Sequence, residues 1–151
     1  MEDFSKFSNK GLSGLANIGN TCYINASLQL LSHTYELNMI LDKIDSSKIN
    51  KNIESIVLKE WDDLRKMMWN QNCSIAPIGF VKGIQSVAKN KNLILFTSFD
   101  QNDISEFINF MIDSFHDALK RPVSMNISGK KDSNVDELAI VAFKMMQDRY
   151  K

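Results

Sequence analysis

Hydrophobic residues recur at spacings of three and four along most of this chain, which is the repeat of helices with one buried face. Polar stretches separate the repeats. The pattern predicts helices over residues 22–32, 34–44, 50–70, 77–88 and 100–121, and a last helix from residue 134 onward. We therefore expect a mainly α-helical fold of about six helices around one core.

Each predicted helix has an apolar face that we assign to the core. The first three faces comprise Ile24, Leu28 and Leu31, then Leu37, Ile40, Leu41 and Ile44, then Ile53, Ile56, Val57, Trp61, Leu64, Met67 and Met68. The last three comprise Phe80, Val81, Ile84, Val87 and Ala88, then Ile104, Phe107, Ile108, Met111, Ile112, Phe115 and Leu119, then Leu138, Val141, Ala142, Met145 and Met146. The Met and Trp residues of the third face could instead form a binding surface, but their helical spacing favours burial.

Local signals predict where these helices begin. Thr34, Asp100 and Asn134 have side chains of the type that caps a helix N-terminus, and Pro77 suits a first helical position. Because proline cannot continue a helix, residues 122–133, which start with a proline, are expected to form a polar loop.

Composition and charge limit the classes of partner that the chain is expected to bind. The chain has 151 residues, which suits one domain, and 44% of them are hydrophobic, enough to form a core. The formal net charge is zero, so nothing steers the chain to nucleic acid or to an acidic membrane surface. No apolar run approaches the roughly 20 residues of a membrane span, and the acidic N-terminus does not resemble a signal peptide. We expect neither a nucleic-acid nor a membrane partner.

The two cysteines, Cys22 and Cys73, are too few for a disulfide framework, and neither lies near another Cys or a His at metal-ligand spacing. We therefore expect no metal or other cofactor. Free thiols fit an intracellular, reducing environment, either cytoplasmic or nuclear. Cys73 lies at a polar turn with no other chemical signal, and we interpret it as incidental.

A segment rich in glycine and asparagine runs directly into the first predicted helix at Cys22. Gly14 and Gly19 permit backbone conformations that are closed to other residues. A helix N-terminus carries unpaired N–H groups and partial positive charge, which favour the nucleophilic thiolate and could hold an oxyanion beside it. The alternative is a buried and inert thiol, the commoner environment of cysteine.

Residues 14–29, Gly-Leu-Ala-Asn-Ile-Gly-Asn-Thr-Cys-Tyr-Ile-Asn-Ala-Ser-Leu-Gln, resemble the cysteine box of the ubiquitin-specific proteases, the papain-like deubiquitinases. The match extends over almost the whole box, with Ile18 and Ile24 as mild replacements. By this resemblance Cys22 is the nucleophile. Asn17 corresponds to the asparagine whose side-chain amide helps to form the oxyanion hole.

A second segment, residues 101–107, reads Gln-Asn-Asp-Ile-Ser-Glu-Phe and resembles the second box of that family, Gln-Gln-Asp-Ala/Ser-His/Gln-Glu-Phe. In the family, acidic residues here help to hold the basic C-terminal tail of ubiquitin. The resemblance assigns this substrate-binding role to Asp103 and Glu106, with Gln101 beside them, whereas Asn102, Ile104 and Ser105 depart from the pattern. Without the resemblance, these residues form an ordinary acidic start to an amphipathic helix.

A cysteine protease also needs a base for its thiol and a group that orients the base. The chain contains two histidines, His33 and His116. At the rise of an α-helix, His33 would lie about 16 Å from Cys22 and His116 about 20 Å from Asp103. Neither lies in a segment that resembles the family's histidine box, so we expect neither to be the base.

The resemblance covers nearly the whole chain but only part of the family's catalytic domain. Residues 14–151 correspond to its helical thumb, after a lead-in loop at residues 1–13, whereas the fingers, the palm and the catalytic His with its partner have no counterpart. The resemblance implies a thiol-dependent hydrolase that cleaves after the C-terminal glycine of ubiquitin, weak or inactive as an isolated chain. Two alternatives remain: a non-catalytic module that binds ubiquitin or another protein, and a plain helical domain whose loop merely resembles the box.

Overall fold

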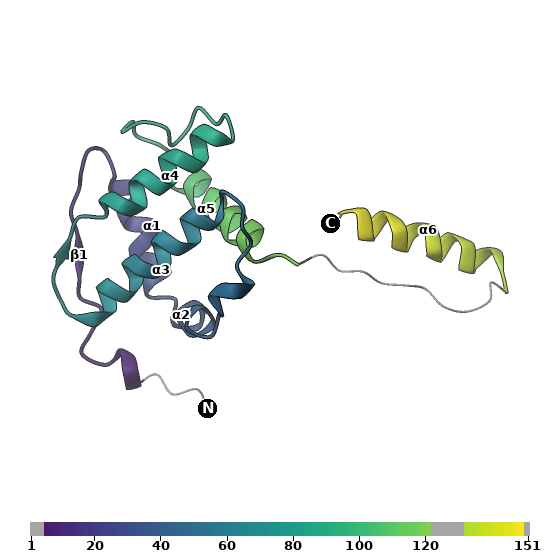
Figure 1. The fold of residues 1–151 in the computed structure, drawn as a ribbon, viewed down its shortest axis with the longest axis horizontal. Coiled ribbons are helices and arrows are strands. Elements are labelled where there is room, and N and C mark those ends of the chain that lie inside the picture. The colour runs from purple at the N-terminus through teal and green to yellow at the C-terminus, as the bar shows by residue number, and fades with distance from the viewer. Residues whose placement is uncertain (1–4, 122–131, 150–151) are drawn as a thin grey trace. The chain divides into compact units, whose positions relative to one another are not determined.

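The computed structural model describes residues 5–121 and 132–149 (Figure 1). The chain divides into two compact units, the first ending at Leu119 and the second beginning at Lys120. The described residues form six α-helices and two strands of two residues, which confirms the predicted mainly helical fold. None of these helices is both long enough and apolar enough to cross a membrane.

The first unit contains five of the α-helices. They are α1 (Cys22–Ser32), α2 (Tyr35–Asp42), α3 (Ser55–Asn70), α4 (Ile78–Asn90) and α5 (Ile104–Leu119), with short 3-10 helices η1 (Ser5–Phe7) and η2 (Ser46–Lys48). The strands β1 (Gly14–Leu15) and β2 (Ser74–Ile75) pair in parallel, with Gly14 opposite Ser74. This pairing joins the segment before α1 to the segment before α4 and was not predicted.

Helix α3 forms the centre of the first unit, since it packs against both α4 and α5, and α1 also packs against α5. Trp61 of α3 is fully buried and meets Phe80 of α4 edge-on, with ring centroids 6.5 Å apart. Phe107 of α5 is fully buried too, and its ring centroid lies 5.3 Å from that of Tyr23 in α1. Burial of one large apolar side chain stabilises a fold by about 1.5–3 kcal/mol. The Trp61–Phe80 contact joins α3 to α4, and the Tyr23–Phe107 contact joins α1 to α5. Because α3 also packs against α5, these four helices share one core.

Most of the predicted buried faces are confirmed, including all five residues assigned to α4. The prediction is wrong for four isoleucine and methionine residues, each at least 41% exposed: Ile40, Met67, Ile104 and Ile112. Leu58 and Phe110 are buried instead. A spacing of three and four selects a wide sector of a helix, and the neighbouring helices cover only part of that sector.

Some helix starts differ from the prediction. Helix α3 begins at Ser55 rather than near Asn50, and the side-chain carbonyl of Asn52 accepts a hydrogen bond from the Ser55 N–H at 3.2 Å. Thr34 precedes α2 as predicted, but its hydroxyl donates back to a carbonyl of α1 instead of capping α2. Pro77 lies one position before α4, within the usual uncertainty of a helix boundary.

Residues 5–13 pack against α2 and α3. The Phe7 ring stacks on Tyr35 of α2, with centroids 4.7 Å apart, and meets Trp69 of α3 edge-on at 4.8 Å. Gly11 has a φ of 79° and lies so close under Trp69 that an added Cβ would be 2.5 Å from that ring. Only glycine fits this position without strain. The segment therefore takes a defined path along the first unit.

The second unit contains α6 (Asn134–Arg149). Its cap is Ser133 rather than Asn134, because the Ser133 hydroxyl accepts a hydrogen bond from the Asp136 N–H at 3.3 Å and donates to the Asp136 carboxylate at 3.0 Å. No residue of α6 is buried within its own unit, and the burial of the face that starts at Leu138 stays a prediction. A single helix has no partner within its own unit to cover that face. The predicted loop at residues 122–133 lies largely outside the described residues.

Candidate active site

The loop that leads to Cys22 passes through two residues with left-handed backbone conformations. Gly19 has a φ of 118° and Asn20 a φ of 48°. Glycine and asparagine are the residues that tolerate this region best, so the Gly-Asn pair gives the turn that leads into α1. An added Cβ on Gly19 would lie 3.5 Å from the ring of Phe99, which places the loop against the segment before α5.

The side-chain carbonyl of Asn17 organises this loop. Its Oδ1 accepts hydrogen bonds from the Gly19 N–H at 3.2 Å, from the Thr21 N–H at 3.1 Å and from the Thr21 hydroxyl at 3.0 Å. Three donors on the oxygen fix the orientation of the amide. Its NH₂ group donates no hydrogen bond within the described residues, and Asn17 is exposed. The amide is thus oriented to donate outward, as an oxyanion-hole side chain must.

Cys22 is the first residue of α1, and its side chain is exposed. The preceding Thr21 occupies the N-cap position but makes no capping hydrogen bond, because its hydroxyl donates to Asn17 and accepts from the Ile18 N–H at 3.2 Å. The first N–H groups of α1 therefore lack a side-chain cap. They carry the partial positive charge of a helix N-terminus, so a negative charge formed beside the sulfur would face hydrogen-bond donors.

Two polar side chains of α1 fasten the helix to the strand that precedes the loop. The Asn25 amide donates to the carbonyl oxygens of Leu15 and Ala16, each at 3.2 Å, and the Gln29 amide donates to the Ser13 carbonyl at 2.7 Å. No role was predicted for these two side chains. The available signal was their position as amides on a largely apolar helix.

The second box forms the start of α5. The Asp103 carboxylate accepts hydrogen bonds from the backbone N–H groups of Ser105 at 2.7 Å and Glu106 at 3.1 Å. Asp103 is therefore the cap, and the prediction that Asp100 caps this helix is wrong. Asp103, Glu106 and Gln101 are all exposed. A carboxylate that caps a helix end is satisfied locally and still presents negative charge to solvent.

The structure brings the two boxes together next to Cys22. The Asn102 amide donates a hydrogen bond to the Tyr23 hydroxyl at 3.1 Å, and the Tyr23 ring packs on Phe107. Burial raises the pKa of the Tyr23 hydroxyl above its ordinary value, and the hydrogen bond from Asn102 opposes that rise. Asn102, one of the three residues of the second box that depart from the family pattern, therefore makes a direct link to the cysteine helix.

Neither histidine lies beside Cys22. His33 follows the last residue of α1, at the end of the helix opposite to Cys22, and its ring lies 5.5 Å from that of Trp69. His116 lies in the last turn of α5, far along the helix from Asp103. Both positions agree with the separation predicted from helix rise. Within residues 5–121 and 132–149, the site therefore has an exposed thiol and oriented hydrogen-bond donors, without a histidine beside the thiol.

Comparison with known proteins identifies relatives over most of the chain. The profile of the ubiquitin carboxyl-terminal hydrolase family matches residues 13–148. Ubiquitin carboxyl-terminal hydrolase Usp2 of Drosophila melanogaster is 32% identical over an alignment of 129 residues, which covers 83% of this chain and 13% of that protein. Human ubiquitin carboxyl-terminal hydrolase 2 is 32% identical over 119 residues, covering 76% of this chain and 19% of the relative. Mouse ubiquitin carboxyl-terminal hydrolase 4 is 30% identical over 138 residues, covering 87% of this chain and 14% of the relative.

This chain belongs to the ubiquitin carboxyl-terminal hydrolase family. The finding confirms the resemblance to the ubiquitin-specific proteases. The chain spans less than a fifth of the length of these three relatives, 13 to 19%.

Proposed function

We propose that this chain carries the nucleophile of a thiol-dependent deubiquitinase, as the helical thumb of its catalytic domain. The observation that supports this best is the exposed Cys22 at the uncapped start of α1, after a loop that Asn17 orients. The Cys22 sulfur attacks the carbonyl carbon of the C-terminal glycine of ubiquitin. The oxyanion accepts hydrogen bonds from the Asn17 amide and from backbone N–H groups.

The reaction then proceeds through an acyl-enzyme. Collapse of the tetrahedral intermediate breaks the bond to the leaving amine and leaves a thioester between Cys22 and ubiquitin, which water hydrolyses. The amine needs a proton, and the thiol must lose one. His33 and His116 lie at helix ends remote from Cys22. Another base must therefore take the proton from the thiol and give one to the leaving amine. We therefore expect the isolated chain to be weak or inactive.

The proposed substrate contact is the basic C-terminal tail of ubiquitin. Asp103 and Glu106 present exposed carboxylates at the start of α5, with Gln101 directly before them. The hydrogen bond between Asn102 and Tyr23 holds that helix start next to the residue that follows Cys22. A basic tail bound along α5 would thus lead toward the thiol. The two free thiols support a proposed intracellular setting, in the cytoplasm or nucleus.

A second candidate is a non-catalytic module that binds ubiquitin or a partner protein. The observation that favours it is the position of both histidines away from Cys22. Even without the rest of a substrate cleft, Asp103 and Glu106 present acidic side chains to a basic tail. In this case Cys22 would not react with ubiquitin, although ubiquitin would still bind.

Labelling by ubiquitin that bears a thiol-reactive group at its C-terminus separates these candidates. We expect a slow covalent adduct that is lost in Cys22→Ala and retained in Cys73→Ala. The Cys73 variant is a matched control because that thiol is half-buried and lies directly before β2, outside the loop of Asn17. Circular dichroism shows whether each variant is folded.

Two results would contradict the catalytic proposal. One is an adduct that persists in Cys22→Ala. The other is an adduct that is lost in Cys73→Ala while Cys22 is intact. For a folded chain that forms no adduct although its Cys22 still reacts with iodoacetamide, binding of ubiquitin decides. If ubiquitin binds that protein without labelling it, the binding module is the better description.

A further inference from the structure

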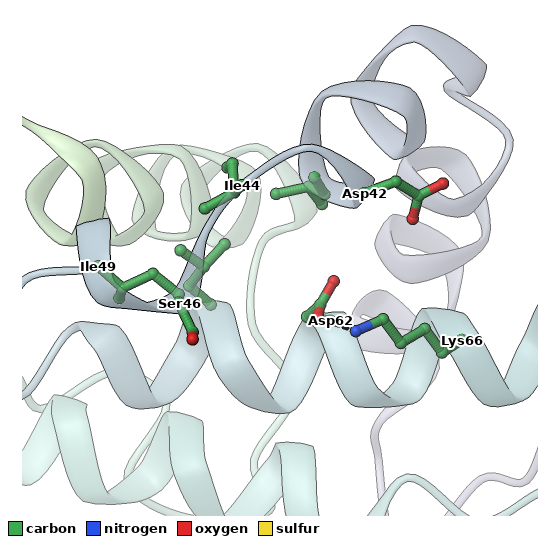
Figure 2. A pocket seen from close by; sticks show the side chains of 8 residues that line it. Asp42, Ile44, Ser46, Ile49, Asp62 and Lys66 are labelled. Carbon is green, nitrogen blue, oxygen red and sulfur yellow. Dashed lines mark hydrogen bonds and ion pairs between the residues drawn. The ribbon is translucent and has the colours of Figure 1, made fainter.

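A pocket of about 390 Å³ lies between α2, the η2 segment and α3 (Figure 2). Its apolar lining consists of Leu41, Ile44, Ile49 and Leu58. In Figure 2, Asp62 and Lys66 come from α3, and the other labelled residues come from α2 and the segment that follows it. Pockets of this size with an apolar lining and few polar groups are typical of sites that bind a small ligand or an anchoring side chain.

A row of alternating charges forms one edge of this pocket. Lys6 pairs with Asp42 at 2.7 Å, and the Arg65 guanidinium pairs with Asp42 at 2.8 Å and Asp62 at 2.6 Å. Lys66 pairs with Asp62 at 2.6 Å. Both carboxylates therefore already have cationic partners, and the three cations outnumber them. A basic ligand would have to displace these partners, whereas an acidic ligand would not.

A second, shallower depression of about 300 Å³ continues from this edge, since Asp42 and Lys66 line both. Its charged lining comprises four cations and one carboxylate: Lys6, Lys10, Arg65, Lys66 and Asp42. Lys10 is exposed and makes no ion pair within the described residues. The Trp69 ring forms an aromatic part of the lining. This depression therefore has an excess of positive charge beside an apolar pocket.

We propose that the two depressions together form a docking surface for an acidic peptide segment with an apolar anchor residue. The anchor fills the pocket over Leu41, Ile44 and Leu58, and the flanking carboxylates pair with Lys10 and with the exposed amino groups of Lys6 and Lys66. Charge complementarity selects this partner over a basic peptide, because Asp42 and Asp62 are already neutralised. We name this area the α2–α3 surface.

The α2–α3 surface lies apart from the proposed active site. Trp69 in its lining contacts His33, which follows the last residue of α1, whereas Cys22 is the first residue of that helix. Eleven residues of helix separate these ends by about 16 Å. A peptide on this surface would leave the thiol accessible. The surface is thus suited to recruit an acidic partner rather than to block the reaction.

Fluorescence anisotropy with the complete chain tests this proposal. The probe is a fluorescein-labelled peptide, Glu-Glu-Leu-Leu-Glu-Glu, compared with peptides in which lysine replaces glutamate or alanine replaces leucine. We expect saturable binding of the first peptide alone, weakened by added salt because the contacts at the rim are exposed. Equal binding of the lysine peptide would overturn the charge argument, and equal binding of the alanine peptide would overturn the anchor.

Two surface variants locate the binding. Lys10→Glu reverses the unpaired cation, and Ser46→Trp places an indole at the mouth of the pocket, where Ser46 is exposed. We expect each to weaken binding by about threefold to tenfold, typical of rim and anchor contacts. Lys82→Glu and Ser86→Trp make the same changes at exposed positions of α4, outside both depressions, and should leave binding unchanged.

Other occupants would give different results. Binding to phosphatidylserine vesicles with no binding of the acidic peptide would overturn the proposal in favour of a lipid surface. A concentration-dependent dimer in sedimentation that Ser46→Trp abolishes, again without peptide binding, would overturn it in favour of a second copy of the chain.

Discussion

The carbonyl oxygen of the Asn17 side chain lies 3.1 Å from the backbone nitrogen of Thr21, the residue that precedes Cys22. This hydrogen bond gives the two ends of the amide different tasks. The oxygen holds the loop in place, and the nitrogen remains available to a developing oxyanion. The two tasks can be separated experimentally, because aspartate retains the acceptor and lacks the donor.

We expect Asn17→Asp to keep the folding stability, since a carboxylate oxygen can accept from Gly19 and Thr21. Asn17→Ala should lower the free energy of unfolding by about 1 kcal/mol, the usual net value of a hydrogen bond. Both variants should form the ubiquitin adduct more slowly than the parent chain. Urea denaturation and adduct rates provide the measurements. Equal adduct rates in the parent chain and Asn17→Asp would show that the amide does not act on the oxyanion.

Asp103 also combines two tasks, as the cap of α5 and as a proposed contact for a basic tail. Asparagine caps a helix about as well as aspartate, so Asp103→Asn should keep the stability, whereas Asp103→Ala should lower it by about 1 kcal/mol. Only the charge distinguishes aspartate from asparagine at this position. We expect Asp103→Asn to weaken binding of a peptide with the sequence of the ubiquitin tail. Unchanged binding in this stable variant would restrict Asp103 to a structural role.

The start of α1 could be predicted because several independent signals agree there: the Gly-Asn turn, the helical repeat after Cys22 and the match to the cysteine box. The start of α5 could not, since Asp100 and Asp103 are both capping residues before the same repeat. Asn102 lies between them, and its side chain donates a hydrogen bond to Tyr23 on another helix. A tertiary contact of this kind has no periodic signal in the sequence.

Two core features were also beyond sequence reasoning. Phe96 is buried against Phe107 and Phe110 with a φ of 64°, a conformation that non-glycine residues rarely adopt and that the surrounding rings hold in place. Arg65 is only 3% exposed, although a charge between apolar positions usually faces solvent. Its burial depends on Asp42, which lies on a different helix.

The hydrogen bond from Asn102 can be tested through the ionisation of Tyr23. Burial raises the pKa of the Tyr23 hydroxyl above the usual value near 10, and the donor on Asn102 lowers it by stabilising the phenolate. Asn102→Ala should therefore raise this pKa further. Alkaline titration of the tyrosine absorbance, with Tyr23→Phe to identify the signal, provides the measurement. A pKa that falls in Asn102→Ala would contradict the assigned direction of the hydrogen bond.

The same shift predicts how stability changes in alkali. A group whose pKa is raised by folding contributes stability that is complete below its unfolded pKa and is lost as the pH rises through the folded value. The parent chain should therefore lose stability above about pH 10. Tyr23→Phe should lose less over that range, as measured by urea denaturation. An identical alkaline loss in both proteins would assign the effect to other groups.

Asp42 predicts the response to acid. Burial opposes its ionisation, but hydrogen bonds from Lys6 and Arg65 outweigh burial and hold the pKa of its carboxyl below the usual value. The stabilisation is present above the unfolded pKa of about 3.9 and is lost as the pH falls through the lower folded value. Asp42→Asn should therefore show a smaller loss of stability between neutral pH and acid. Asp63→Asn, at an exposed position of α3, is the matched control and should follow the parent chain.

Arg65 bridges two helices through its ion pairs, since its guanidinium binds Asp42 of α2 and Asp62 of α3. Arg65→Met should lower the free energy of unfolding by about 1–2 kcal/mol, because Asp42 and Asp62 lose the buried guanidinium that they share and keep only Lys6 and Lys66 as partners. Lysine at this position cannot form both forked contacts, so Arg65→Lys should recover only part of the loss. The combined variant Asp42→Asn, Asp62→Asn, Arg65→Met also removes the two carboxylates that lost Arg65 and leaves the exposed Lys6 and Lys66 to solvent, so it should be more stable than Arg65→Met alone. If the combined variant is less stable, the loss in Arg65→Met reflects packing of the long side chain rather than charge.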